Sequence, residues 1–104
     1  MAIRGTGSVE LPAYGAADAE HRVEKEILRH LPHARVIVLS IARAGAAERI
    51  VEEFRVTYRI EVSMQVEAAE AGAPASAAFR AARAALEGTR YAGVAWEVAA
   101  PGGA

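Results

Sequence analysis

The chain has 104 residues, with 12 basic and 13 acidic side chains, a net charge of −1 and no cysteine. This length is typical of one domain. Near-neutral charge disfavours a general nucleic-acid binder, which neutralises phosphates with a basic surface. The lack of cysteine excludes disulfides, thiolate catalysis and cysteine-ligated zinc. The sequence shows no stretch of transmembrane length and no signal-peptide core, so we expect a cytoplasmic protein that does not enter a membrane.

Alanine dominates the apolar part of the sequence. Hydrophobic residues make up 53% of the chain, and 26 of them are alanines. Because alanine buries little area, the predicted core is thin, and we expect a homo-oligomer that hides further surface. Eleven of the 12 basic residues are arginines. This bias, together with the alanine content, indicates a GC-rich bacterial genome and carries no functional meaning.

The first predicted elements are a strand and a helix. Residues 1–11 alternate between apolar and polar, which is typical of a half-buried strand. Gly5 and Gly7 lie within it, and glycine inside a strand indicates close approach by another backbone. Apolar residues then recur every four positions, which predicts a helix over about 17–31, with Asp18 as its N-cap.

Two further strands are predicted in the middle of the chain. Residues 34–43 are almost continuously apolar and favour a strand covered on both faces, followed by a loop at 44–47. Residues 50–68 alternate strictly, so the even positions of 54–66 are expected to be buried and the odd ones solvated. The long second strand exceeds its ten-residue partner, and its spare edge predicts pairing with another strand or subunit.

The last third of the chain predicts a helix and a strand. The helix begins near Pro74, which suits a first turn, and ends at Gly88. Residues 91–99 alternate again and predict the last strand, and 101–104 form a flexible tail. We therefore expect residues 1–100 to form a single α+β domain. Its βαββαβ order predicts a ferredoxin-like two-layer sandwich, an antiparallel sheet with both helices on one face.

The sequence contains no recognisable catalytic or metal motif. Its histidines, His21, His30 and His33, lack the further ligands that a zinc site needs, and surface positions are expected for them. Three residues are candidates for ligand binding. They are Tyr58 with its hydroxyl, Trp96 as a stacking platform for a flat ligand, and Arg55 on a polar strand face that suits an anion.

The middle of the chain, roughly residues 9–68, resembles the dodecins, small flavin-storing proteins with a βαββ fold. The resemblance rests on Leu28-Arg29-His30-Leu31, on the strand from 38 to 43 and on the stretch from 53 to 62. It implies self-assembly and an alternative fold, βαββ with a C-terminal αβ extension. Pro32-His33-Ala34 replaces the family's flavin-stacking tryptophan, and the flavin-contacting glutamine falls near Arg55, so the cofactor stays open.

Both ends of the chain resemble the SIMPL domain. The opening carries the likeness in Gly5-Thr6-Gly7-Ser8-Val9-Glu10-Leu11-Pro12. The closing part carries it in the strand–helix–strand from 54 to 98, including Gly93-Val94-Ala95-Trp96-Glu97-Val98. Neither resemblance supplies a catalytic residue.

Three functions are compatible with these patterns. The first is a non-catalytic, self-associating domain that binds a small ligand or a partner protein, in a cavity between the sheet and the helices near Tyr58 and Trp96. The second is a small ferredoxin-like dimeric enzyme of the monooxygenase or isomerase type, with Tyr58, His21 or Trp96 as candidates. The third, an RNA-binding sheet, is disfavoured because paired exposed aromatic residues are missing from the middle strands. We expect the first.

Overall fold

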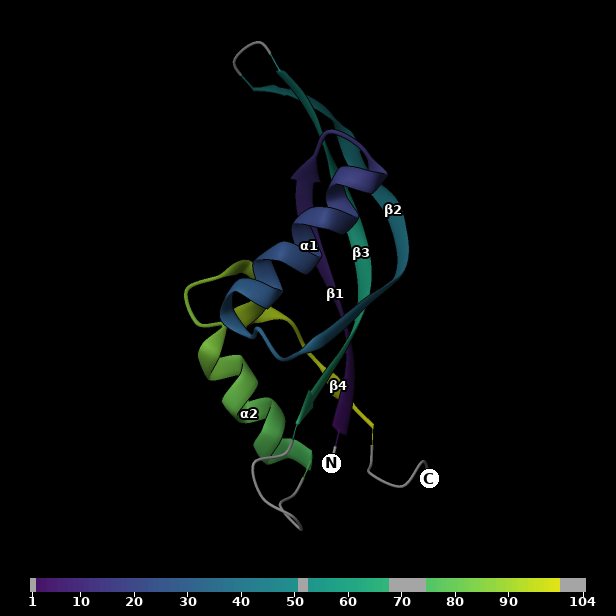
Figure 1. The fold of residues 1–104 in the computed structure, drawn as a ribbon. Coiled ribbons are helices and arrows are strands. Elements are labelled where there is room, and N and C mark those ends of the chain that lie inside the picture. The colour runs from purple at the N-terminus through teal and green to yellow at the C-terminus, as the bar shows by residue number, and fades with distance from the viewer. Residues whose placement is uncertain (1, 51–52, 68–74, 100–104) are drawn as a thin grey trace.

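A computed structural model describes residues 2–50, 53–67 and 75–99. Over these residues the chain forms a four-stranded antiparallel sheet and two α-helices, an α+β fold (Figure 1). The elements are, in chain order, β1 (Ala2–Ala13), α1 (Ala16–His30), β2 (Arg35–Ile50), β3 (Glu53–Glu67), α2 (Ala75–Ala85), a 3₁₀ turn (Arg90–Gly93) and β4 (Glu97–Val98). The strands lie in the order β2-β3-β1-β4. The predicted tail at 101–104 lies outside the described residues.

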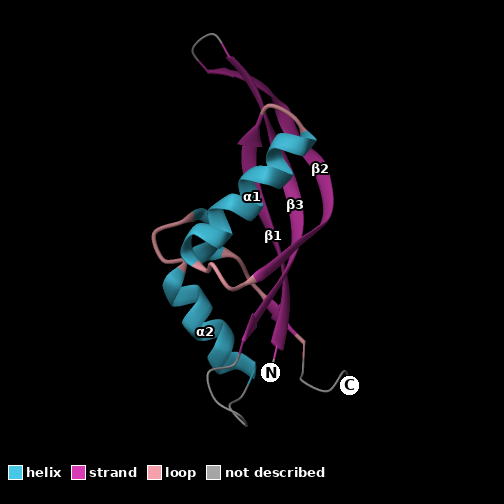
Figure 2. Cartoon of the chain, in the orientation of Figure 1, coloured by secondary structure: helices cyan, strands magenta, loops and turns pink. Residues whose placement is uncertain are grey.

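The core lies between the sheet and the helices, which are on the same side of the sheet (Figure 2). β1 pairs antiparallel with β3 along the whole length of β1, with Val9 opposite Ile60 and Ile3 opposite Val66. The inward residues of both strands join residues of both helices in one buried cluster. The cluster contains Ile3, Val9, Leu11, Ala13, Ala19, Val23, Ile27, Ile60, Val62, Met64, Val66, Phe79, Ala82, Leu86, Tyr91 and Val94.

The alternation predicted for β3 is confirmed over its second half. The even residues from 60 to 66 are buried, whereas Arg59 and Glu61 are exposed. Ser63 is the exception, because this odd residue is only 7% exposed. It lies in a central strand between Thr6 of β1 and Ile37 of β2, so neighbouring side chains cover it. In the first half the side chains at 55–58 are all half-buried, so the predicted alternation is wrong there, and the side chain at 54 is outside the described part.

The loop predicted at 44–47 is wrong, because β2 runs on to residue 50. Its pairing with β3 shifts register between Val38 and Ser40 and again between Arg43 and Ala47, so irregularities take the place of a loop. β2 and β3 therefore have nearly equal lengths of 16 and 15 residues. On the edge of β3 away from β2, residues 56–67 pair with β1, so the pairing predicted for this edge is with the first strand of the same chain.

The helix predicted near 17–31 is confirmed as α1, with its buried face formed by Ala19, Val23 and Ile27. The predicted N-cap is wrong. Gly15 occupies the cap position without a side-chain hydrogen bond, and Asp18 lies in the first helical turn. The Asp18 carboxylate still accepts a backbone hydrogen bond. The donor is the N–H of Tyr14, the residue before the cap.

The second helix is confirmed, and Gly88 follows it with a positive φ of 86°, a conformation that glycine adopts without strain. The predicted strand at 91–99 is largely wrong. Residues 90–93 form a 3₁₀ turn, and only Glu97–Val98 pair with β1. The Thr89 hydroxyl accepts the Tyr91 backbone N–H and starts the turn. Tyr91 is thereby directed into the core, where it is completely buried.

Candidate ligand groove

The two glycines of β1 provide room for large side chains. A Cβ atom at Gly5 would overlap the ring of Phe79, and one at Gly7 would overlap Val94. The same added atom at Gly7 would lie 3.1 Å from Cε3 of Trp96. The close approach predicted from the glycines is confirmed, but the approaching groups are side chains from α2 and from the stretch before β4, not the backbone that was expected.

Phe79 and Trp96 form an aromatic pair above this part of β1. Their ring centroids are 6.0 Å apart and the planes are tilted by 49°. Phe79 is buried, whereas Trp96 is half-buried and packs against the edge of the core. The indole Nε1 is buried and has no hydrogen-bond partner among the described residues. The pair therefore presents an apolar surface fixed on the sheet by the two glycines.

A hollow of about 350 Å³ lies beside this pair. Phe79, Arg80 and Arg83 of α2 line one side, and Trp96 and Val98 line the other. We call these five residues the α2–β4 groove. Its size falls within the roughly 300–1,000 Å³ range of small-molecule sites. The lining combines apolar surface with two guanidinium groups and contains no carboxylate.

Of the three ligand-binding candidates from the sequence, only Trp96 lies in the groove. Tyr58 pairs with Leu11 of β1, whereas Trp96 lies beside Gly7. The four-residue step from Gly7 to Leu11 corresponds to about 13 Å of strand at a rise of ~3.3 Å per residue. The register therefore does not bring Tyr58 and Trp96 to one site.

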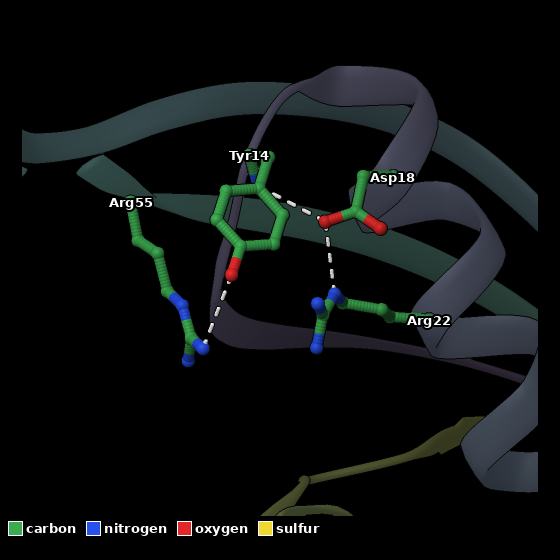
Figure 3. A network of polar contacts seen from close by, with 4 residues as sticks. All are labelled: Tyr14, Asp18, Arg22 and Arg55. Atoms are coloured by element: carbon green, nitrogen blue, oxygen red, sulfur yellow. Dashed lines mark hydrogen bonds and ion pairs between the residues drawn. The ribbon is translucent and has the colours of Figure 1, made fainter. Parts of the chain in front are cut away.

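Arg55 belongs to a polar network near the start of α1 (Figure 3). Its Nη2 donates to the Tyr14 hydroxyl at 3.4 Å, and its guanidinium lies 5.3 Å from the centre of the Tyr14 ring. The Arg22 guanidinium lies 5.6 Å from the same centre. Tyr14 thus contacts two cations, in the arrangement of cation–π pairs.

Asp18, in the first turn of α1, belongs to the same network. Its Oδ2 accepts the backbone N–H of Tyr14 at 3.0 Å and the Nε of Arg22 at 2.9 Å. The Tyr14 amide, and then Arg22, hold the pKa of this carboxyl below its usual value of 3.8. The same pair raises the pKa of Arg22. These contacts tie α1 to the end of β1, so we interpret the network as structural.

A half-buried polar contact joins α1 to the 3₁₀ turn. The Tyr91 hydroxyl donates to Oε1 of Glu26 at 2.8 Å, and Arg90 Nε lies 3.1 Å from the same oxygen. Burial and then the hydrogen bond to Glu26 raise the pKa of Tyr91. Sequence reasoning missed this contact because the two partners are 65 positions apart.

The enzyme candidates are spread over separate parts of the fold. His21 is exposed on α1, Tyr58 is half-buried on β3, and Trp96 lies in the groove. His30 and His33 are exposed. Within the described ranges, no three histidine or acidic residues are grouped so as to hold a metal ion.

Sequence reasoning also missed Arg80 and Arg83. The available signal was their spacing of three positions on a helix whose charged residues are all basic. That spacing places two guanidinium groups on one helical face. Phe79 precedes them directly, but only the fold shows that its ring reaches Trp96.

Comparisons with protein-family models, with curated proteins and with solved structures found no match to this chain. The resemblances to dodecins and to the SIMPL domain therefore stay predictions. None of the described helices has the length and apolarity needed to cross a membrane.

Proposed function

We propose that this chain is a non-catalytic, self-associating domain that binds a small ligand in the α2–β4 groove. The observation that carries the proposal is the aromatic pair of Phe79 and Trp96, which is seated on two glycines beside a ligand-sized hollow. Small-molecule sites are typically concave and apolar with a few polar groups. The groove has this composition, and its polar groups are both cationic.

The proposal includes a ferredoxin-like architecture. Its support is the chain order of strands and helices together with the strand order β2-β3-β1-β4. The short β4 and the preceding 3₁₀ turn depart from the full-length last strand expected for that architecture. The departure bears on function, because it leaves the edge beside α2 open for the groove.

Self-association is proposed through the free edge of β2. This strand is outermost in the sheet, and among the described residues it pairs only with β3. Ile37 and Leu39 are each 52% exposed on it, which is unusual for large apolar side chains on a free strand edge. Pairing the β2 edges of two copies around a two-fold axis would satisfy the free backbone groups of this edge and place the exposed apolar side chains of the two copies side by side.

The ligand-binding part is tested with two dyes that share one ring system. These are the anion 8-anilinonaphthalene-1-sulfonate and the uncharged N-phenyl-1-naphthylamine. Trp96 is the only tryptophan, so energy transfer from it reports a dye bound nearby. We expect transfer to at least one dye and its loss in Val98→Phe, which fills the groove. If neither dye gives transfer, the groove is not a binding site.

The self-association part is tested by light scattering at micromolar concentration. We expect a mass of at least two chains for the wild type and of one chain for the Ile37→Lys/Leu39→Lys variant. Ala17→Lys, on the exposed start of α1, is the control and should keep the wild-type mass. A monomeric wild type, or an unchanged mass after both β2 substitutions, contradicts this part.

A further inference from the structure

Arg80 and Arg83 lie on the rim of the α2–β4 groove. They are one helical turn apart on α2 and are both exposed. Residues three positions apart on a helix are surface neighbours, about 5–6 Å between Cβ atoms, so their guanidinium groups repel each other. The repulsion is relieved when an anion lies between them.

Among the described residues, no contact uses these two charges. Neither Arg80 nor Arg83 makes an ion pair or a side-chain hydrogen bond with another described residue. By contrast, three arginines elsewhere are matched with carboxylates. These pairs are Arg22 with Asp18 at 2.9 Å, Arg59 with Glu10 at 2.8 Å and Arg90 with Glu26 at 3.1 Å.

The surface below the guanidinium groups is apolar. The Phe79 and Trp96 rings and the Val98 side chain form it, and Val98 is 36% exposed. Arginine binds planar carboxylates and phosphates through two parallel hydrogen bonds, and it stacks on aromatic rings. The groove therefore offers an apolar floor and an anion-binding rim within one hollow.

From this arrangement we propose that the ligand of the α2–β4 groove is an amphipathic organic anion. Its flat or aliphatic part lies against Phe79, Trp96 and Val98. Its carboxylate, sulfonate or phosphate group lies between Arg80 and Arg83. The inference rests on the proposed function, because it assigns a chemical class to the ligand of the same groove. Binding as proposed depends on both the apolar and the anionic part of the ligand, so we expect inorganic phosphate alone to bind weakly.

The two dyes test this class directly, because only one of them carries an anionic group. We expect the sulfonate dye to bind at least about tenfold more tightly than the uncharged dye, as a charge-assisted contact implies. Its affinity should fall with added sodium chloride, whereas that of the uncharged dye should not. Sodium phosphate should lower the affinity of the sulfonate dye no more than sodium chloride does at the same ionic strength. These measurements need only the wild-type protein.

Arg80→Gln/Arg83→Gln is the matched variant. We expect it to weaken binding of the sulfonate dye about tenfold and to leave the uncharged dye within about twofold of wild type. Arg29→Gln, an exposed arginine of α1, is the control and should change neither affinity. Thermal melts establish that each variant is folded before the titrations are compared.

Equal affinities for the two dyes in the wild type would overturn the assignment of ligand class while the groove remained a binding site. Unchanged sulfonate binding in the double variant would also overturn it. Absence of both dyes from the groove is a different result, because it removes the proposed function itself. If the double variant does not fold, the charge preference and salt dependence of the wild type still decide the question.

Discussion

The two helices pack on the same side of the sheet, but they use their charged residues differently. Along α1, Asp18 pairs with Arg22, and Glu26 holds both Tyr91 and Arg90. The contacts of Glu26 join the helix to the 3₁₀ turn. α2 carries two arginines and otherwise mainly small apolar residues, and neither arginine pairs with a carboxylate in the described part of the chain.

This difference separates groups that stabilise the fold from groups that are available to a ligand. A guanidinium with a carboxylate partner contributes a directed contact and has its charge matched. An unmatched pair of guanidinium groups beside an apolar hollow contributes little to folding. Substitutions on the two helices should therefore give opposite results in stability and binding measurements.

The largest loss of stability is expected at the joint between α1 and the 3₁₀ turn. Tyr91→Ala removes a completely buried ring and its hydrogen bond to Glu26. We expect the free energy of unfolding to fall by about 3–5 kcal/mol, as for other large aromatic truncations. Tyr14→Ala, at a side chain that is 50% exposed, is the control and should cost much less. Chemical denaturation measures the free energy of unfolding of both variants. Equal losses would show that the buried Tyr91 ring contributes no more to stability than the exposed Tyr14 ring.

The next largest loss of stability is expected at the glycines of β1 that lie beneath the groove. Gly5→Ala introduces a Cβ that overlaps the Phe79 ring, so we expect a loss of about 1–3 kcal/mol from overpacking. Gly93→Ala is the control, because no heavy atom lies within 4 Å of the added carbon.

A double-mutant cycle sharpens this second prediction. If the ring causes the loss at Gly5, then Phe79→Leu should make Gly5→Ala less costly, with coupling of at least about 0.5 kcal/mol. Additive effects in chemical denaturation would show that Phe79 is not the group that needs the glycine.

Arg80→Gln/Arg83→Gln should leave stability nearly unchanged. Since neither charge is paired within the described ranges, we expect a change within about 0.5 kcal/mol. The urea midpoint of the variant and of the wild type measures this change. A loss of 2 kcal/mol or more, about the size of a broken buried contact, would show that these arginines support the fold.

The smallest expected effect is the acid dependence of Asp18. Its folded pKa lies below the usual 3.8 because the Tyr14 amide and Arg22 stabilise the carboxylate. The resulting stabilisation is therefore fully present when the pH is above 3.8, the pKa in the unfolded chain. It is lost as the pH falls through the lower pKa of the folded protein. Thermal melts should separate wild type from Asp18→Asn at neutral pH and converge in acid. A gap that is constant with pH, or that appears also in Glu87→Gln, would contradict this.

The sheet could be predicted from the sequence where one face is buried and the other solvated. Val62 and Met64 alternate with residues on the opposite face, and a register slip would expose the whole apolar set. The loop at 44–47 was wrong because small residues allow an irregular strand as readily as a loop. Tyr91 was predicted to begin a strand but lies in a 3₁₀ turn. The local cap by Thr89 and the distant partner Glu26 override the short alternating pattern.

The groove could be predicted only in part. Gly5 and Gly7 indicated a close approach, and Trp96 was identified as a candidate stacking surface. The link between them depends on β4 pairing with β1 across more than 90 positions, which a local pattern does not encode. Arg80 and Arg83 looked like any solvated helix face until the fold placed them beside an aromatic pair.

The contrast between the matched and unmatched arginines is tested most directly by NMR of the arginine Nε–Hε groups. Spectra are recorded while 8-anilinonaphthalene-1-sulfonate is added to the wild-type protein. The account predicts progressive shifts for Arg80 and Arg83, while the carboxylate-paired Arg22 and Arg90 remain unchanged. Shifts confined to Arg22 and Arg90, with Arg80 and Arg83 unmoved, would contradict it.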